Sequence, residues 1–212
     1  MRMMRPVQAL LDRQYRRPSG LLGYFVGAQM VRQHEPEMQW TLSLLSLKST
    51  DHVLEIGCGA GRALEIVTAQ VPAGHVSGID YSPTMIEASR RRNSRAIAMG
   101  HLELFQADVM QLPFADASFD TIWSIHSIYF WPDRDRALAE IARVLKPGGL
   151  LVLTFSPGKT GTQAVNDILT MVEEQQIPTM RQLGFSNVSL QQGPASRQFR
   201  TSAVAGQKER AS

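Results

Sequence analysis

The feature that most constrains the fold of this 212-residue chain is an alternation of strand and helix signals that begins near residue 51. A short apolar run, Val53–Ile56, ends at a glycine and predicts a buried strand. A helix over 62–70 and a strand over 75–80 follow it. Strands that are joined by helices pair in parallel, with helices on both faces of the sheet. The chain is therefore expected to be an α/β protein.

The later elements are predicted from similar signals. Ser82 suits a helix N-cap, Pro83 the first helical position and Gly100 a C-cap, so one helix is expected from Ser82 to Met99. The other predicted elements are strands over 102–107, 119–124, 150–155, 185–191 and 199–206, and helices over 133–145 and 162–175. Together these elements predict a Rossmann-like, seven-stranded, mostly parallel sheet.

The N-terminal segment has a different character. Residues 1–48 precede the first predicted strand and read as mainly helical. Within them, residues 18–30 are apolar on most sides, and such a helix must be covered or must itself cover something. This stretch is too short to span a bilayer, so no transmembrane segment is expected. We expect an N-terminal helical lid over 1–48 and a binding domain over 49–212.

Composition limits the classes of partner and the cellular location. The net charge is only +3, and the basic residues gather towards both ends of the chain. No run of five or more like charges occurs, which favours a solvated surface over a nucleic-acid or membrane site. Cys58 is the single cysteine, so no internal disulfide can form and a reducing, cytoplasmic location is expected.

A glycine-rich turn follows the first predicted strand. Glu55 is followed by Gly57, Gly59 and Gly61, each separated by one residue. Glycines let the chain turn sharply and let a ligand approach the backbone N–H groups. The dinucleotide fingerprint G-x-G-x-x-G would need its third glycine at position 62, where the chain has arginine. The pattern is therefore E-x-G-x-G-x-G.

This pattern resembles the first motif of class I S-adenosylmethionine (SAM)-dependent methyltransferases, in the small-molecule branch that includes ubiquinone and menaquinone biosynthesis (type 11). The resemblance covers about residues 50–156. The other segments that carry it are Gly78–Ser82, Gln106–Asp108, Leu112–Phe114, Ser118–Asp120 and Arg143–Gly149.

The resemblance implies where SAM would bind. It assigns Glu55 to the SAM ammonium group, Asp80 to the ribose hydroxyls and Asp108 to the adenine amino group. A carboxylate suits a ribose because it can accept two hydrogen bonds from a vicinal diol. The predicted cofactor-binding residues are Tyr15, Glu55, Gly57, Cys58, Gly59, Gly61, Asp80, Tyr81, Met85, Asp108, Val109 and Ser124.

Some of these residues have a second interpretation. Cys58 suits a small structural side chain beside the ligand better than a nucleophile. Asp80 and Asp108 could instead be acids at helix N-termini. Met85 could fill the core and not pack on the adenine.

The predicted acceptor side follows the fourth strand, at residues 124–133. His126 is the candidate general base, because imidazole titrates near neutral pH; alternatively it only hydrogen-bonds the loop. Tyr24 and Tyr129 are the other catalytic candidates. Trp131 is expected either to line the pocket or to pack in the core.

The remaining histidines fall at the edges of predicted elements. We expect all four to be surface residues: His34, His52, His75 and His101.

The motifs also bear on the acceptor. The Asn/Asp-Pro-Pro-aromatic motif of nucleic-acid and protein methylating relatives is missing after the fourth strand, which counts against a nucleic acid as the acceptor. No pair of Asp or Asn ligands stands out there either, so no metal is expected. The predicted acceptor is a small, apolar or aromatic molecule that is methylated on O or N, or alternatively on C. The alternatives are a SAM-binding sensor or scaffold, and a methyltransferase for RNA or lipid. The expected assembly is a monomer or a homodimer.

Overall fold

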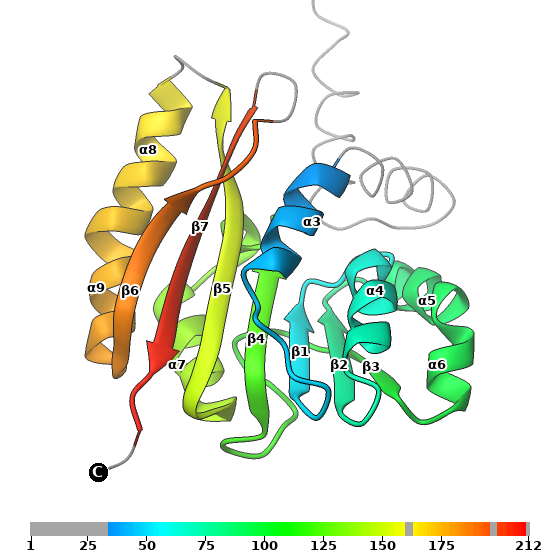
Figure 1. Cartoon of the computed structure of the whole chain (residues 1–212). Coiled ribbons are helices and arrows are strands. Elements are labelled where there is room, and N and C mark those ends of the chain that lie inside the picture. The colour runs from blue at the N-terminus through cyan, green and yellow to red at the C-terminus, as the bar shows by residue number, and fades with distance from the viewer. Residues whose placement is uncertain (1–33, 160–162, 196–198, 211–212) are drawn as a thin grey trace, which may run out of the picture.

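The computed structural model describes residues 34–159, 163–195 and 199–210 (Figure 1). Within these residues, seven strands form one sheet in the order β3-β2-β1-β4-β5-β7-β6. The strands are β1 His52–Ile56, β2 His75–Asp80, β3 Leu102–Gln106, β4 Phe119–Ile125, β5 Leu145–Lys159, β6 Phe185–Gln192 and β7 Phe199–Lys208. Strand β7 pairs antiparallel with both of its neighbours, and the other pairings are parallel. The predicted mostly parallel sheet is confirmed.

Helices cover both faces of the sheet (Figure 1). Helices α3, α4 and α5 contribute to one apolar cluster, and α7, α8 and α9 to the other. The helices are α3 Glu35–Ser43, α4 Arg62–Gln70, α5 Pro83–Arg92, α6 Ser94–Ala98, α7 Arg134–Val144, α8 Gln163–Met171 and α9 Ile177–Gln182, with a 3₁₀ turn η1 at Ile128–Phe130 and a π-helical turn η2 at Val172–Gln176. Of the described helices, none has the length and apolarity needed to cross a bilayer.

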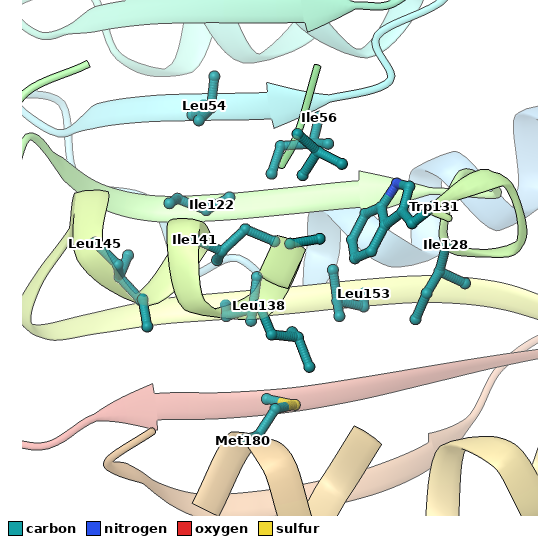
Figure 2. Close-up of a cluster of buried hydrophobic side chains, with 14 of the residues drawn as sticks. Leu54, Ile56, Ile122, Ile128, Trp131, Leu138, Ile141, Leu145, Leu153 and Met180 are labelled. Carbon is teal, nitrogen blue, oxygen red and sulfur yellow. The ribbon is translucent and has the colours of Figure 1, made fainter. Parts of the chain in front are cut away.

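The central strands are apolar on both sides because each face is covered. Successive side chains of a strand point to opposite faces. In β4, Ile122 lies in the cluster with Leu138 and Ile141 of α7, as Figure 2 shows. The next residue, Trp123, lies in the opposite cluster, with Leu64 of α4. This two-sided burial explains why these strands read as continuous apolar runs.

The helix predicted from Ser82 to Met99 is wrong in one respect, because it is interrupted at Asn93. Helix α5 ends at Arg92, and α6 begins at Ser94. The buried Asn93 side chain donates hydrogen bonds to the carbonyl oxygens of Gly61 and Ser89, both at 3.0 Å. Asn93 therefore ties this helix to the glycine turn, and its backbone leaves the helical conformation (φ −102°, ψ 18°).

Two other predicted elements are longer in the structure. The helix over 162–175 is described from Gln163 and continues through η2 and α9 to Gln182. The strand over 150–155 is part of β5, which starts at Leu145 and shifts register against β4 between Phe119 and Thr121.

Helix α3 is the described part of the N-terminal segment. It packs against β5 and α4. The Thr41 and Thr154 hydroxyl oxygens lie 2.7 Å apart in a buried hydrogen bond, which fixes α3 to β5. The apolar stretch 18–30, on which the lid prediction rests, lies outside the described residues.

Candidate functional site

A cavity of about 660 Å³ lies at the carboxyl ends of the parallel strands. Helix α3 and the segment 125–132 form its other walls. Ligands of open α/β sheets bind at this edge. The sequence-predicted residues that line it are Glu55, Gly57, Cys58, Gly59, Asp80, Tyr81, Met85, Asp108, Val109, His126 and Tyr129.

The other predicted residues lie behind the cavity wall or outside the described chain. Gly61 is the N-cap residue of α4, and its carbonyl oxygen accepts a hydrogen bond from Asn93 Nδ2. Ser124 is buried in β4, with its hydroxyl hydrogen-bonded to that of Ser127. Tyr15 and Tyr24 fall outside the described residues.

Asp80 is fixed by the backbone on both sides. Its Oδ2 accepts from the Gly59 N–H at 2.9 Å, and its Oδ1 accepts from the Ser82 N–H at 2.8 Å. Burial raises the pKa of Asp80, and the two amide hydrogen bonds oppose that shift. Each carboxylate oxygen has a second lone pair, so both can still accept a bond from a diol. The arrangement fits the ribose role that the resemblance implies.

Glu55 is a buried carboxyl group at the end of β1. Its side chain is 4% exposed, and its Oε2 has no hydrogen-bond partner among the described residues. Burial is the main cause that raises the pKa of Glu55, and the Asp80 carboxylate adds to the effect. A buried carboxyl group needs a partner to offset its desolvation. The ammonium group of SAM would supply one.

Asp108 follows β3, the neighbour of β2. Its Oδ1 accepts from the Met110 N–H at 2.9 Å. Parallel pairing of β1 with β2, and of β2 with β3, brings Glu55, Asp80 and Asp108 to the same edge of the sheet. The three acids therefore line one cavity in the order that the resemblance implies.

Cys58 and Met85 make part of the wall less polar. Both side chains are buried and border the cavity. Burial raises the pKa of the Cys58 thiol, and the Asp80 and Glu55 carboxylates add to that shift. The thiol therefore stays protonated, which fits the structural interpretation of Cys58.

His126 follows β4 and has an unusual backbone conformation. Its φ is 56°, in the left-handed region, and its N–H donates to the Thr154 carbonyl oxygen at 2.9 Å. Burial lowers the pKa of His126 to about 3, and the nearby His34 contributes to the shift. Its ring is therefore neutral near pH 7.

Tyr129 determines which ring nitrogen of His126 carries the proton. The Tyr129 hydroxyl donates to the Ser156 carbonyl oxygen at 3.1 Å and accepts from the Ser156 N–H. His126 Nδ1 lies 3.3 Å from the same hydroxyl oxygen. With the hydroxyl proton directed to the Ser156 carbonyl oxygen, Nδ1–H is the donor to Tyr129, and Nε2 keeps its lone pair.

His34, which was predicted to be a surface residue, is 36% exposed, but it also has a place at the cavity that the sequence did not predict. His34 lines the cavity, and its ring centroid lies 4.3 Å from that of His126. His34 lies just before α3, whereas its neighbour His126 follows β4 and is distant from it in the sequence. The spacing His34-x-x-Glu37 predicts only that these two side chains lie near each other at a helix start, and it does not say which part of the sheet they cover.

Trp131 satisfies both interpretations made from sequence. Its side chain is 6% exposed in the core cluster and also borders the cavity. Ser127, from the predicted acceptor segment 124–133, also lines the cavity, as does Met38 of α3, which sequence reasoning missed.

Comparison with known proteins points to one family. A family described as a methyltransferase domain matches residues 54–153. The chain is 39% identical over 125 residues to the 27-O-demethylrifamycin SV methyltransferase of Amycolatopsis mediterranei, covering 57% of this chain and 45% of that protein. It is 34% identical over 128 residues to the demethylmenaquinone methyltransferase of Listeria monocytogenes, covering 59% and 54%. The chain thus spans about half the length of these relatives.

The fold is also similar to that of solved methyltransferases. The Haemonchus contortus phosphoethanolamine N-methyltransferase 2, solved in complex with S-adenosyl-L-methionine, matches with a TM-score of 0.68 and 17% identity, over 82% of this chain and 52% of that one. The type 11 resemblance agrees with the matched family, whose limits enclose the glycine turn, Asp80 and Asp108. Over residues 54–153 the chain is thus similar to methyltransferase domains, which agrees with the SAM-dependent methyltransferase resemblance of its sequence motifs.

Proposed function

We propose that this chain transfers the methyl group of SAM to an O, N or C atom of a small apolar or aromatic acceptor. One observation carries the proposal. Glu55, Asp80 and Asp108, from the ends of three neighbouring strands, line a single cavity beside the glycine turn. Similarity to enzymes named methyltransferases supports it.

Each side chain has a defined task in this proposal. Glu55 binds the ammonium group, Asp80 the ribose diol and Asp108 the adenine amino group. When bound, SAM supplies a methyl group on a positively charged sulfur, which is already activated for in-line displacement. The chain then contributes mainly orientation of the two reactants and exclusion of water. The buried walls around Cys58 and Met85 suit that second task.

The acceptor would bind on the side of the cavity formed by the segment after β4. His126, Tyr129, Phe130 and Trp131 make this wall rich in rings. The names of two relatives specify a rifamycin and a menaquinone precursor as the molecules methylated. Both the ring-rich wall and these names support an apolar or aromatic acceptor for this chain.

Other expectations remain part of the proposal. Residues 1–48 would form the lid, with Tyr15 and Tyr24 contacting SAM or acceptor. The chain would act in the cytoplasm as a monomer or a homodimer. A nucleic-acid acceptor is not proposed.

Calorimetry with S-adenosylhomocysteine (SAH) and SAM tests the cofactor half of the proposal. We expect saturable binding of both to the full chain. A screen of SAM consumption over phenols, amines, carboxylic acids and lipids then tests transfer. SAH and SAM binding without transfer to any acceptor would favour the sensor or scaffold alternative. Failure to bind either ligand would refute the proposal altogether.

Replacing His126 separates the acceptor side from the cofactor side. We expect His126→Asn to lower kcat at least about tenfold, because the side chain that faces the acceptor is lost. Asparagine tolerates the left-handed backbone of this position, so the loop should keep its conformation. The affinity for SAH should stay within about threefold of wild type, since residues other than His126 bind SAM. Unchanged kcat would remove His126 from the acceptor site.

A further inference from the structure

A second group of side chains meets where α3 and the segment after β4 form the cavity wall, and two of its members, His34 and His126, line the cavity. It consists of His34 and Glu37, at the start of α3, and His126, after β4. One possible ligand atom from each lies within 4.8 Å of the others. His34 Nδ1 is 3.9 Å from Glu37 Oε1, and the two imidazole rings are 4.3 Å apart, inclined at 49°.

Two atoms of this group are buried and have no hydrogen-bond partner among the described residues, although each can offer a lone pair. Glu37 is 3% exposed, and its Oε2 finds no hydrogen-bond partner in the described part of the chain. His126 Nε2 is likewise buried, with no partner among those residues. Tyr129 makes Nδ1 the protonated nitrogen, so Nε2 offers a lone pair and no proton. Buried acceptors of this kind need a cation or a hydrogen-bond donor to offset their desolvation.

The backbone holds the two halves of the group together through one residue. Thr154 of β5 accepts the His126 N–H with its carbonyl oxygen. The side-chain hydroxyl of Thr154 is hydrogen-bonded to the hydroxyl of Thr41 in α3. Helix α3 in turn carries Glu37 one turn before Thr41 and His34 just before its start. The group is therefore positioned by ordered backbone on both sides.

We infer that His34, Glu37 and His126 form a binding site for a divalent transition-metal ion, with an open coordination position towards the acceptor. Two imidazoles and one carboxylate are the ligands of catalytic zinc sites and of iron(II) sites with open positions. The hydrogen bond from His126 to Tyr129 is the outer contact that usually orients a histidine ligand. Ligand atoms on a tetrahedral zinc ion lie about 3.4 Å apart, so small side-chain rotations would close the site. This site differs from the metal-free site expected from the sequence.

The open position identifies a class of acceptor, and this part of the inference rests on the proposed function. A bound divalent ion lowers the pKa of an oxygen ligand. A hydroxyl of the acceptor that binds there would lose its proton to solvent water. Its oxygen could then form the O–C bond to the methyl group as the C–S bond breaks and its electron pair stays on sulfur. The inference therefore favours a hydroxylated acceptor, methylated on oxygen.

Metal titration of the full chain tests the site directly. The protein would be prepared without a polyhistidine tag, stripped with a chelator, and titrated with Zn²⁺ by calorimetry and with Co²⁺ by visible absorption. We expect one Zn²⁺ per chain and a Co²⁺ spectrum typical of nitrogen and oxygen ligands. His34→Ala, Glu37→Gln and His126→Asn should each weaken Zn²⁺ binding at least about tenfold. Wild-type protein that binds no Zn²⁺ stoichiometrically would overturn the inference.

A matched control comes from a second histidine–carboxylate pair. His75 Nε2 lies 3.8 Å from Glu103 Oε2, near the amino ends of β2 and β3, and the cavity lies at the carboxyl ends of these strands. His75→Ala should leave Zn²⁺ affinity unchanged, and an equal loss in this variant would also overturn the inference. Circular dichroism would confirm that each variant is folded.

SAH calorimetry on the same stripped protein separates this inference from the proposed function. Retained SAH binding with no Zn²⁺ binding would reject the metal site alone. Loss of both would reject the proposed function too.

Discussion

Replacing Asp80 by alanine is expected to lower the affinity for SAH at least about 100-fold. In the proposed role of Asp80, the ribose of SAH would lose two charge-assisted hydrogen bonds to the carboxylate, each contributing about 1.5–3 kcal/mol. Even the lower value for each bond corresponds to about two powers of ten in Kd. Calorimetry with SAH measures this loss.

The same substitution also affects folding, and a matched variant separates the two effects. Asp80→Ala leaves the N–H groups of Gly59 and Ser82 without their acceptor. Asp120 has a similar structural role at the opposite end of the sheet, where it accepts from the His52 N–H and from Lys146, at 2.9 and 2.8 Å. Asp120→Ala should lower stability but leave SAH affinity within about threefold of wild type. Comparable losses of affinity in both variants would show that Asp80 acts only through folding.

The local pattern of the sequence predicted most of the fold, because its elements have clear ends. Helix α4 and strand β2 have the predicted bounds, Arg62–Gln70 and His75–Asp80. Each is an apolar stretch limited by glycine or proline, and both faces of the sheet are covered. The interruption at Asn93 could not be predicted in this way. It depends on the Gly61 carbonyl oxygen, 32 residues earlier in the chain.

In the site, too, residues placed by local sequence patterns could be predicted, and residues placed by contacts distant in sequence could not. The acids at the strand ends could be placed from sequence, because the carboxyl ends of parallel strands meet at one edge. His34 could not, because α3 precedes the sheet in sequence and no local signal says which strand end it covers. Its contact with His126 depends on the way Thr154 joins α3 and the loop after β4. The chemistry of the acceptor side therefore required the structure.

The glycine turn also sets a limit on substitution that can be measured as stability. Gly61 has φ 74°, and a Cβ added there would lie 2.2 Å from Ser89 Oγ and 2.5 Å from Asn93 Nδ2. Neither neighbour can move freely, because both are buried and Asn93 donates to the Gly61 carbonyl oxygen. Left-handed strain of about 1–2 kcal/mol adds to an overpacking cost of about 1–3 kcal/mol. We expect Gly61→Ala to lower the free energy of unfolding by about 2–5 kcal/mol.

Gly100 provides the control for strain alone. Its φ is 72°, close to that of Gly61, but an added Cβ would meet no described atom within 4 Å. Gly100→Ala should therefore cost only about 1–2 kcal/mol in urea unfolding. If both variants lose the same stability, contact with α5 plays no part in the requirement for glycine at position 61.

A double-mutant cycle then assigns the additional cost to a particular neighbour. Ser89→Ala removes the hydroxyl oxygen that lies nearest to the added Cβ, although the Ser89 Cβ at 3.0 Å remains. We expect Gly61→Ala to cost at least about 1 kcal/mol less in the Ser89→Ala background than in wild type, since residues in contact couple by this amount. Additive losses would contradict the steric explanation. A positive coupling would show that α5 packs directly on the glycine turn. One close contact would then join this turn to the part of the site that we propose binds the ribose.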